Sequence, residues 1–179
     1  TALICRGNAA WLVPPLQRAG FHLLDRIVYF ERTASLTSPP HKLQASLRPI
    51  RSGDLPTLLA LDSVAFEPFW RFDRGHFMEM LVTMGHSTIA EKAGQPAGYA
   101  FSDVLREMGF ITRLAVHPNF QGHGIGSQLL ADGLAYCRSA GATTIRLNTQ
   151  ESNIISHRLY QRFDFQRAGR QIPVLVREL

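Results

Sequence analysis

The sequence predicts a mixed α/β domain, because segments with helical and with strand periodicity alternate along most of its length. In 125–137 the apolar residues recur three and four positions apart, as on one face of a helix. Two extended segments, 87–92 and 96–104, flank the turn Ala93-Gly94-Gln95 and predict a hairpin. A further strand, 110–117, runs into a glycine-rich turn that opens the helix of 125–137.

The composition is that of one globular domain. The chain has 179 residues, of which 45% are apolar and 18% charged, which is enough for a substantial core and excludes a disordered chain. Cys5 and Cys137 are too few for a disulfide scaffold and have no metal-ligand spacing. No run of about 18 apolar residues occurs, and Pro14 and Pro15 interrupt the N-terminal apolar stretch, so neither a membrane span nor a signal peptide is predicted. We expect a cytoplasmic protein.

The formal net charge is +5, but the charges are too evenly spread to predict a nucleic-acid-binding surface. Residues 1–46 contain five Lys or Arg and two acidic residues, a balance of +3, and the rest contains 14 basic and 12 acidic residues, a balance of +2. No run of Lys or Arg and no basic stripe with interleaved aromatics occurs. We therefore expect no nucleic-acid partner and no membrane partner.

The first elements are separated by clear turn signals. Residues 33–45 are rich in Ser, Thr and Pro without an apolar period, so we predict a linker, and the main domain is predicted to span 46–179. It begins with a strand at 47–50. Ser52-Gly-Asp54 then has the chemistry of a turn and a helix cap, and a helix at about 58–65 follows. The aromatic segment 66–73 is predicted to be a loop.

The remaining elements continue the alternation. Phe77, Met80, Leu81 and Met84 lie at helical spacing. Met78, Met80 and Met84 are most simply core residues. Gly141 is expected to end the helix of 125–137. The predicted elements, in chain order, are a helix at about 77–84, the hairpin strands at 87–92 and 96–104, a strand at 110–117, a helix at 125–137, a strand at 143–149, a helix at about 153–163 and strands toward residue 179.

The N-terminal segment repeats the pattern of the C-terminal one. Asn8, followed by the segment Leu16 to Phe21, resembles Asn153 followed by Tyr160 to Phe165, and an extended segment follows each. A match this short also arises by chance, yet the same elements occur twice in the same order. We predict that residues 1–32 are the tail of an upstream copy of the module, without its glycine turn. We expect them to pack against the main domain or against a second chain in a homodimer.

The glycine-rich turn, 121–127, predicts a binding site for an anion. A strand leads into it and a helix leads out, and the unpaired N–H groups at a helix start attract phosphate. Glycine lets the ligand approach the backbone closely. There is no Gly-Lys-Ser/Thr, so this is not a Walker loop, and the glycine spacing does not fit the dinucleotide fingerprint G-x-G-x-x-G.

The turn fits the pattern Gln-x-x-Gly-x-Gly, with Gln121, Gly124 and Gly126. It thereby resembles the pyrophosphate loop of the GNAT superfamily of N-acetyltransferases. Downstream, Asn153 and Tyr160 resemble that family's closing helix, whose common ending Leu-Tyr-x-x-x-Gly-Phe has Asp164 in place of Gly here. The resemblance covers about residues 46–179. It implies a GNAT-like fold, a central twisted mixed β-sheet flanked by helices with two splayed parallel strands.

The resemblance also implies acetyl-CoA as co-substrate and a primary amine, on a small molecule or a peptide, as acceptor. Main-chain groups of the strand end would bind the pantetheine arm, and one N–H would polarise the thioester carbonyl. Tyr160 would be the general acid that protonates the departing CoA thiolate. The implied cofactor-binding residues are Leu114, Ala115, Val116, Gln121, Gly122, His123, Gly124, Ile125, Gly126, Ser127 and Asn153.

The acceptor side is less defined by the sequence. Trp70 and Arg71 lie in a loop whose counterpart in similar proteins borders the acceptor pocket. These two residues are therefore substrate-contact candidates. Relatives that acetylate protein N-termini often have, at the position of Asn148, a Glu that acts as the catalytic base. Asn148 cannot accept a proton at neutral pH. Either the acceptor is a weakly basic amine or the base lies elsewhere. The nearby candidates for such a base are Glu67, Asp73, His76 and Glu107.

Each assignment has a structural alternative. Tyr160 can be a core aromatic, Asn153 can cap its helix, and Trp70 can be a packing anchor. His117 and His123 flank the turn without acidic or Cys partners, so we expect no metal. Two other function classes also stay open: an acyl-CoA-binding module of the same fold with weak or no transfer, and a nucleic-acid-binding domain, which only the net charge suggests.

Overall fold

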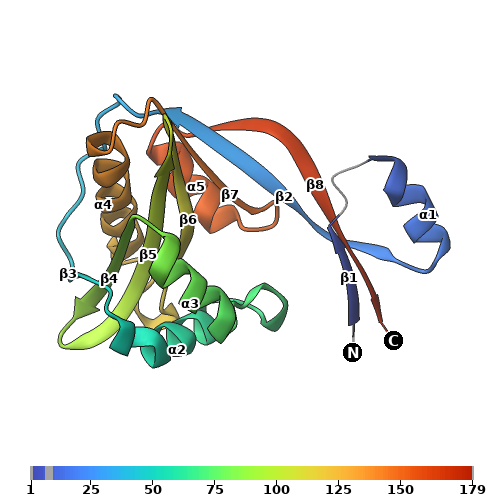
Figure 1. The fold of residues 1–179 in the computed structure, drawn as a ribbon, viewed down its shortest axis with the longest axis horizontal. Coiled ribbons are helices and arrows are strands. Elements are labelled where there is room, and N and C mark those ends of the chain that lie inside the picture. Colours follow the sequence, from blue (N-terminus) through green and yellow to red (C-terminus); the bar gives the residue numbers. More distant parts are fainter. Residues whose placement is uncertain (1, 7–9, 179) are drawn as a thin grey trace. The chain divides into compact units, whose positions relative to one another are not determined.

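The structure is a computed structural model that describes residues 2–6 and 10–178 (Figure 1). It divides into two compact units: unit 1 comprises Thr1–Glu31 with Leu147–Leu179, and unit 2 comprises Arg32–Arg146. Asn8, with which the predicted repeat begins, lies outside the described residues. None of the described helices is long and apolar enough to cross a bilayer.

Unit 2 is built on a sheet of consecutive strands. In it β3 (Ser46–Pro49), β4 (His86–Lys92), β5 (Gln95–Leu105) and β6 (Met108–Val116) each pair antiparallel with the next. The predicted hairpin is present: Ala93 and Gly94, both with positive φ, connect β4 to β5. Gln95, which was expected in the turn, is the first residue of β5. The beginning of β7 (Thr144–Gln150) is the other neighbour of β6.

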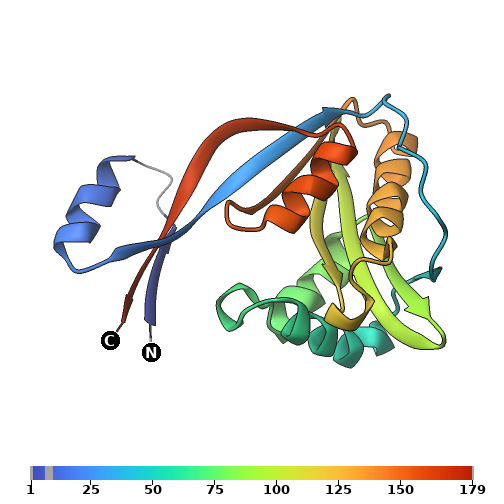
Figure 2. The ribbon, with the colours of Figure 1, turned by 180° about the vertical axis from the view of Figure 1, so that it is seen from behind.

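Helices cover both faces of this sheet (Figures 1 and 2). Because side chains alternate along a strand, Ile89 and Tyr99 lie on one face and Ala90 and Ala100 on the other. On the first face the strands pack against α2 (Leu55–Ala65) and α3 (Arg74–Thr83). Met80 of α3 is buried there, but Met78, which was expected in the core, is exposed. On the second face they pack against α4 (Ile125–Ser139), through Ile125 and Leu129. Small alanines on that face let α4 approach closely.

Unit 1 is a long strand ribbon with two helices. Its strands are β1 (Ala2–Arg6), β2 (His22–Thr33), β8 (Gln166–Glu178) and the end of β7. They lie in the order β1-β8-β2-β7, and β8 pairs antiparallel with both β1 and β2. The helices are α1 (Val13–Arg18) and α5 (Ile154–Arg162).

The elements expected after residue 46 occur in the predicted order, with two corrections. The C-terminal segment, expected as several strands, is the single strand β8. Asp54 does not cap α2 with its side chain, because its carboxylate accepts the Arg51 N–H (2.8 Å) and pairs with Arg48. Of the predicted linker, 33–45, Thr33 is the last residue of β2, and residues 34–45 contain no helix or strand, yet Ala34 is buried.

Asp164, which stands where the family's closing helix commonly has Gly, has a φ of +59°, in the left-handed region. Here α5 ends in a Schellman motif, in which Phe165 N–H donates to Tyr160 O and Asp164 N–H to Gln161 O, both at 3.0 Å. The Tyr160 and Phe165 rings pack 6.0 Å apart beneath the motif. Asp164 therefore occupies the position that favours glycine, which explains why the family's Gly is the common residue there.

Candidate active site

The glycine turn joins the end of β6 to the start of α4. Gly122 and Gly124 have φ +77° and +83°, a backbone conformation that other residues rarely adopt. Gly124 is the N-cap of α4 and supplies no side-chain hydrogen bond to the helix. A helical bond runs from Gln128 N–H to Gly124 O at 3.1 Å, and the amides of Ile125 and Gly126 at the helix start have no acceptor within the helix. Both conformation and polarity suit a bound pyrophosphate.

Side chains around the turn stabilise its backbone. Gln121 donates from Nε2 to Val116 O (3.1 Å), which ties the turn to the end of β6. The imidazole of His123 bonds to Gln121 O at 2.9 Å, and that of His117 accepts the Asn119 N–H at 3.1 Å. Both histidines thus contact backbone groups. No cluster of metal-ligating side chains occurs among the residues that the structure describes.

A buried glutamine, which the sequence analysis did not single out, fixes a second segment beside the turn. Gln128 is 4% exposed, and its Oε1 accepts the N–H groups of Gln44 (2.9 Å) and Ala45 (3.1 Å). Its Nε2 donates to Ala45 O at 2.7 Å. A Cβ added to Gly124 would lie 3.6 Å from Gln44 Cγ. The predicted linker is therefore anchored at its end, next to the glycine turn.

Replacing Gln128 by Leu is expected to cost about 2–3 kcal/mol of unfolding free energy, because three backbone groups lose their partner. Urea unfolding measures the loss. Hydrogen exchange should show faster exchange at Gln44 and Ala45, since their N–H groups are the ones released. Unchanged exchange at these two amides would show that Gln128 does not hold the segment.

The end of β6 is closely paired on the side of β5. Val116 is opposite Gly98, and Ala115 is 3% exposed. A Cβ on Gly98 would lie 2.5 Å from Ala115 O, so this approach requires glycine. The predicted pantetheine-binding segment, Leu114–Val116, is thus the paired end of β6 and is followed by the 3₁₀ turn Pro118–Phe120 that leads into the glycine turn.

A buried ion pair lies under the aromatic segment 66–73. Asp62 on α2 is fully buried, and its Oδ1 accepts from Arg113 Nη2 (2.6 Å) and Nε (3.0 Å) and from the Tyr99 hydroxyl. Its Oδ2 accepts the Phe72 N–H at 2.8 Å. Burial raises the pKa of Tyr99, which therefore stays protonated and donates. All of the carboxylate's partners are donors, as a buried charge requires.

Arg113 also holds the segment itself. Its guanidinium carbon lies 3.6 Å from the Phe66 ring centroid and 3.9 Å from that of Phe72. Its Nη2 donates to Trp70 O at 2.8 Å. Both ends of the segment are therefore fixed to β6, immediately before Leu114. The sequence analysis did not single out Asp62, Tyr99 or Arg113. The available signal was an acidic and a basic residue within otherwise apolar segments.

The substrate-contact candidates lie on this fixed segment. Trp70 belongs to a short 3₁₀ turn, where its N–H donates to Glu67 O (2.8 Å) and its ring meets Phe69 edge-on. Arg71 is exposed, and its Nε donates to Phe66 O at 3.0 Å. Arg113 binds the Trp70 carbonyl, so the backbone at this position is held against β6.

Of the four candidate bases, Asp73 and His76 contact each other. Asp73 Oδ1 lies 2.7 Å from His76 Nδ1, and the His76 ring stacks on Phe72. The His76 N–H, which also bonds Asp73, lowers the pKa of that carboxyl. Glu67 is exposed. Glu107 was expected nearby, but it lies nine residues before Val116 at the opposite end of β6, roughly 30 Å away.

The remaining predicted residues belong to unit 1. Asn148 is exposed on β7, and Asn153 caps α5 by accepting the Ser156 N–H at 3.1 Å. Tyr160 is 7% exposed and packs against Phe30, with ring centroids 5.8 Å apart. Burial raises the pKa of Tyr160 to about 12, although a hydrogen bond with Ser156 opposes the shift. The phenol is therefore protonated at neutral pH.

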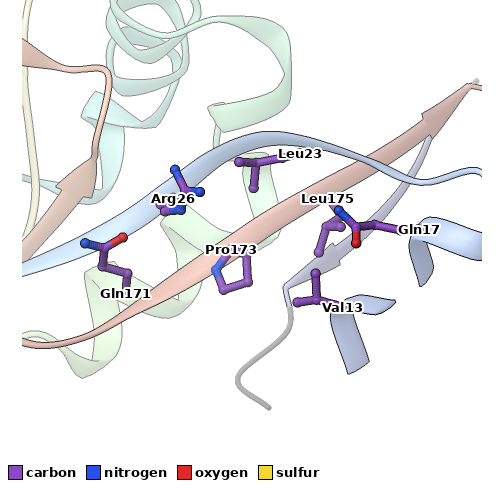
Figure 3. A pocket seen from close by; sticks show the side chains of 7 residues that line it. All are labelled: Val13, Gln17, Leu23, Arg26, Gln171, Pro173 and Leu175. Carbon is purple, nitrogen blue, oxygen red and sulfur yellow. The ribbon is translucent and has the colours of Figure 1, made fainter. Parts of the chain in front are cut away.

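Unit 1 also contains a hollow that none of the predicted residues line (Figure 3). It has a volume of about 330 Å³ between α1, β2 and β8. Arg26 on its wall is paired with Glu151 at 3.1 Å. The lining residues are Val13, Gln17, Leu23, Arg26, Gln171, Pro173 and Leu175. The lining of the hollow is mostly apolar, and it includes none of the predicted catalytic, cofactor-binding or substrate-contact residues.

Comparison with known proteins covers both sequence and fold. The model of the acetyltransferase (GNAT) family matches residues 54–165. A putative ribosomal protein bS18-alanine N-acetyltransferase of Bacillus subtilis is 25% identical over 128 residues, which are 72% of this chain and 85% of that protein.

Two solved structures share the fold. A GCN5-related N-acetyltransferase from Sphaerobacter thermophilus superposes with a TM-score of 0.76 and 16% identity, over 99% of this chain but only 59% of its own. Arabidopsis thaliana Naa50 in complex with the bisubstrate analogue CoA-Ac-MVNAL has a TM-score of 0.63 and 22% identity, over 76% of this chain and all of its own. With the family model covering more than half of the residues, the chain belongs to the acetyltransferase (GNAT) family.

Proposed function

We propose that this protein transfers the acetyl group of acetyl-CoA to a primary amine, and that the glycine turn binds the CoA pyrophosphate. The observation that carries the proposal is the start of α4, where two glycines with positive φ precede helix amides that have no acceptor within the helix. A Cβ at Gly122 would meet no atom within 4 Å, and the nearest to one at Gly124 is the Gln44 side chain at 3.6 Å. The turn is therefore open enough for a phosphate to reach its backbone.

The chemistry proposed is direct transfer. The neutral amine nitrogen attacks the thioester carbonyl carbon, the C–N bond forms, and the C–S bond breaks as CoA leaves as a thiolate. A main-chain N–H near Val116 stabilises the oxyanion. Tyr160 gives its phenolic proton to the thiolate. Because burial raises the pKa of Tyr160, the phenol carries this proton at neutral pH. The amine's surplus proton passes to solvent or to a nearby base.

The acceptor proposed is an α-amino group. Asn148 offers no proton acceptor, so the amine must be partly neutral before it binds. At pH 7 an α-amine with a pKa of about 7.7–8.0 is roughly 10–15% neutral, whereas a lysine amine with a pKa of about 10.4 is roughly 0.04% neutral. The relative named as an alanine N-acetyltransferase and the fold neighbour bound to a peptide bisubstrate analogue support the same class.

Steady-state kinetics with two matched peptides tests the acceptor class. One peptide carries a free α-amine and no lysine, and the other an acetylated N-terminus and one lysine. We expect kcat/KM to be at least about 100-fold higher for the α-amine at pH 7, in line with the neutral fractions. It should rise about tenfold per pH unit below pH 7 and level off near pH 8. Equal turnover of the lysine peptide would contradict the proposal and point to a base, for which the Asp73–His76 pair is the candidate to mutate.

A further inference from the structure

Unit 1 contains the same β-α-β arrangement twice. The elements β1, α1 and β2 repeat as β7, α5 and β8, at a constant offset of 144 residues from Leu16 to Tyr160 and from Phe21 to Phe165. The sequence echo at these positions is short. The structure adds the same three elements in the same order around it.

The two helices also end in the same way. After α1, Phe21 N–H donates to Leu16 O and Gly20 N–H to Gln17 O, both at 3.0 Å. After α5 the bonds join the residues 144 positions later, at the same distances. Gly20 has φ +84° where Asp164 has φ +59°. Two Schellman motifs at equivalent positions are local evidence of a repeat that does not depend on residue identity.

The sheet order of unit 1 has the corresponding pseudo-two-fold symmetry. Exchanging β1 with β7 and β2 with β8 turns the order β1-β8-β2-β7 into its own reverse. The register follows this symmetry closely: His22 is opposite Val176, which by symmetry places residue 32 opposite Gln166, and the observed partner is Glu31. The axis therefore runs between the antiparallel strands β2 and β8.

The symmetry is broken at one edge. In unit 2 the beginning of β7 has β6 as its neighbour, whereas β1 has β8 on one side and no described strand on the other. Likewise α5 buries Tyr160, while α1 buries no residue and Leu16, the equivalent of Tyr160, is half-buried. Among the described residues, the N-terminal repeat therefore lacks the second strand neighbour and the buried helix residue that the C-terminal repeat has.

We propose that the outer edge of β1 is the docking edge for a second acetyltransferase core, supplied by the same polypeptide ahead of Ala2. In unit 2 the chain runs from β6 through α4 into β7, so an equivalent core would run into β1 in the same way. A second copy of this chain cannot provide that neighbour from its β6, which already lies between β5 and β7. The Sphaerobacter thermophilus structure matches 99% of this chain with 59% of its own length, so a fold neighbour carries additional chain.

Hydrogen exchange at β1 tests the proposal independently of any enzymatic activity. The 179-residue chain is compared with an extended chain in which a second copy of residues 32–145 replaces Thr1, so that Ile145 is followed by Ala2 as it is natively by Arg146. In the 179-residue chain, the β1 amides that point away from β8 should exchange freely. In the extended chain we expect them to slow by at least about 100-fold in a monomer. Exchange at the added copy of β5 shows whether the added core is folded.

A matched pair of variants separates docking from general stabilisation. Leu16→Glu should lower the unfolding midpoint of the extended chain more than that of the 179-residue chain, whereas Ile155→Glu, exposed on α5, should affect both chains alike. The proposal is overturned if the outward β1 amides are already protected from exchange in the 179-residue monomer. It is also overturned if these amides become protected only in a dimer. It is equally overturned if they stay unprotected beside a folded added core, or if that core does not fold on this edge.

Discussion

Replacing Tyr160 by Phe is expected to lower kcat for acetyl transfer by about 10²–10⁴-fold, the usual contribution of a general acid. The phenol oxygen is the only group removed, and its ring contacts with Phe30 and Phe165 stay. The dissociation constant of acetyl-CoA should therefore change by less than about twofold. Pre-steady-state kinetics with the α-amine peptide measures the chemical step.

Tyr29→Phe is the matched control, because it removes a phenol oxygen from a half-buried tyrosine of the same unit that has no proposed role. It should leave kcat unchanged. If Tyr160→Phe behaves the same way, Tyr160 is a packing residue and another donor protonates the thiolate.

The raised pKa of Tyr160 also predicts the pH dependence of stability. The folded-state value of about 12 lies above the unfolded value of 10, so ionisation favours the unfolded chain. The stabilisation is complete below pH 10 and is lost as the pH rises toward 12. Tyr160→Phe should weaken this alkaline loss.

Replacing Arg113 by Leu is expected to lower the free energy of unfolding by about 3–5 kcal/mol, because the fully buried Asp62 carboxyl loses its counter-ion. The segment 66–73 should loosen as well, since the same guanidinium stacks on Phe66 and Phe72 and binds Trp70 O. Urea unfolding gives the free energy, and Trp70 fluorescence reports on the segment.

Two further variants test whether the loss of unfolding free energy comes from breaking the buried ion pair. The double variant Asp62→Leu with Arg113→Leu should recover much of the loss, since no unpaired charge remains. Arg48→Leu removes an arginine whose pairs with Asp54 and Glu91 are partly exposed, and it should cost less than about 1 kcal/mol. A loss for Arg113→Leu as small as that for Arg48→Leu would mean that the buried pair contributes little.

The order of elements in unit 2 was predictable because its signals are local. Helical spacing in 125–137 and the hairpin turn at Gly94 depend on neighbours in sequence, and the structure confirms both. The pairing of β2 with β8 was not predictable, since it joins residues more than 130 positions apart and no local pattern specifies the partner. The same holds for Asp62 and Arg113, which come from separate elements.

In the candidate site, the conformation of the glycine turn was predictable for the same reason. The glycine turn depends on backbone conformation, and Gly122 and Gly124 do have the positive φ that only glycine adopts readily. The position of Gln128 against Gln44 depends on a contact across 84 residues and gave no signal in the sequence. The proposed acceptor class follows from Asn148 only indirectly, because the role proposed for the turn is to bind the constant part of the co-substrate.

Calorimetric titration of acetyl-CoA into the purified chain tests the central claim most directly. Gly124→Glu places a carboxylate at the start of α4, and Gly94→Glu is its matched control, with a similar positive φ at a hairpin turn outside the site. We predict binding by the parent and by Gly94→Glu, and none by Gly124→Glu. Absence of binding by the folded parent, or equal binding by Gly124→Glu, would contradict the account.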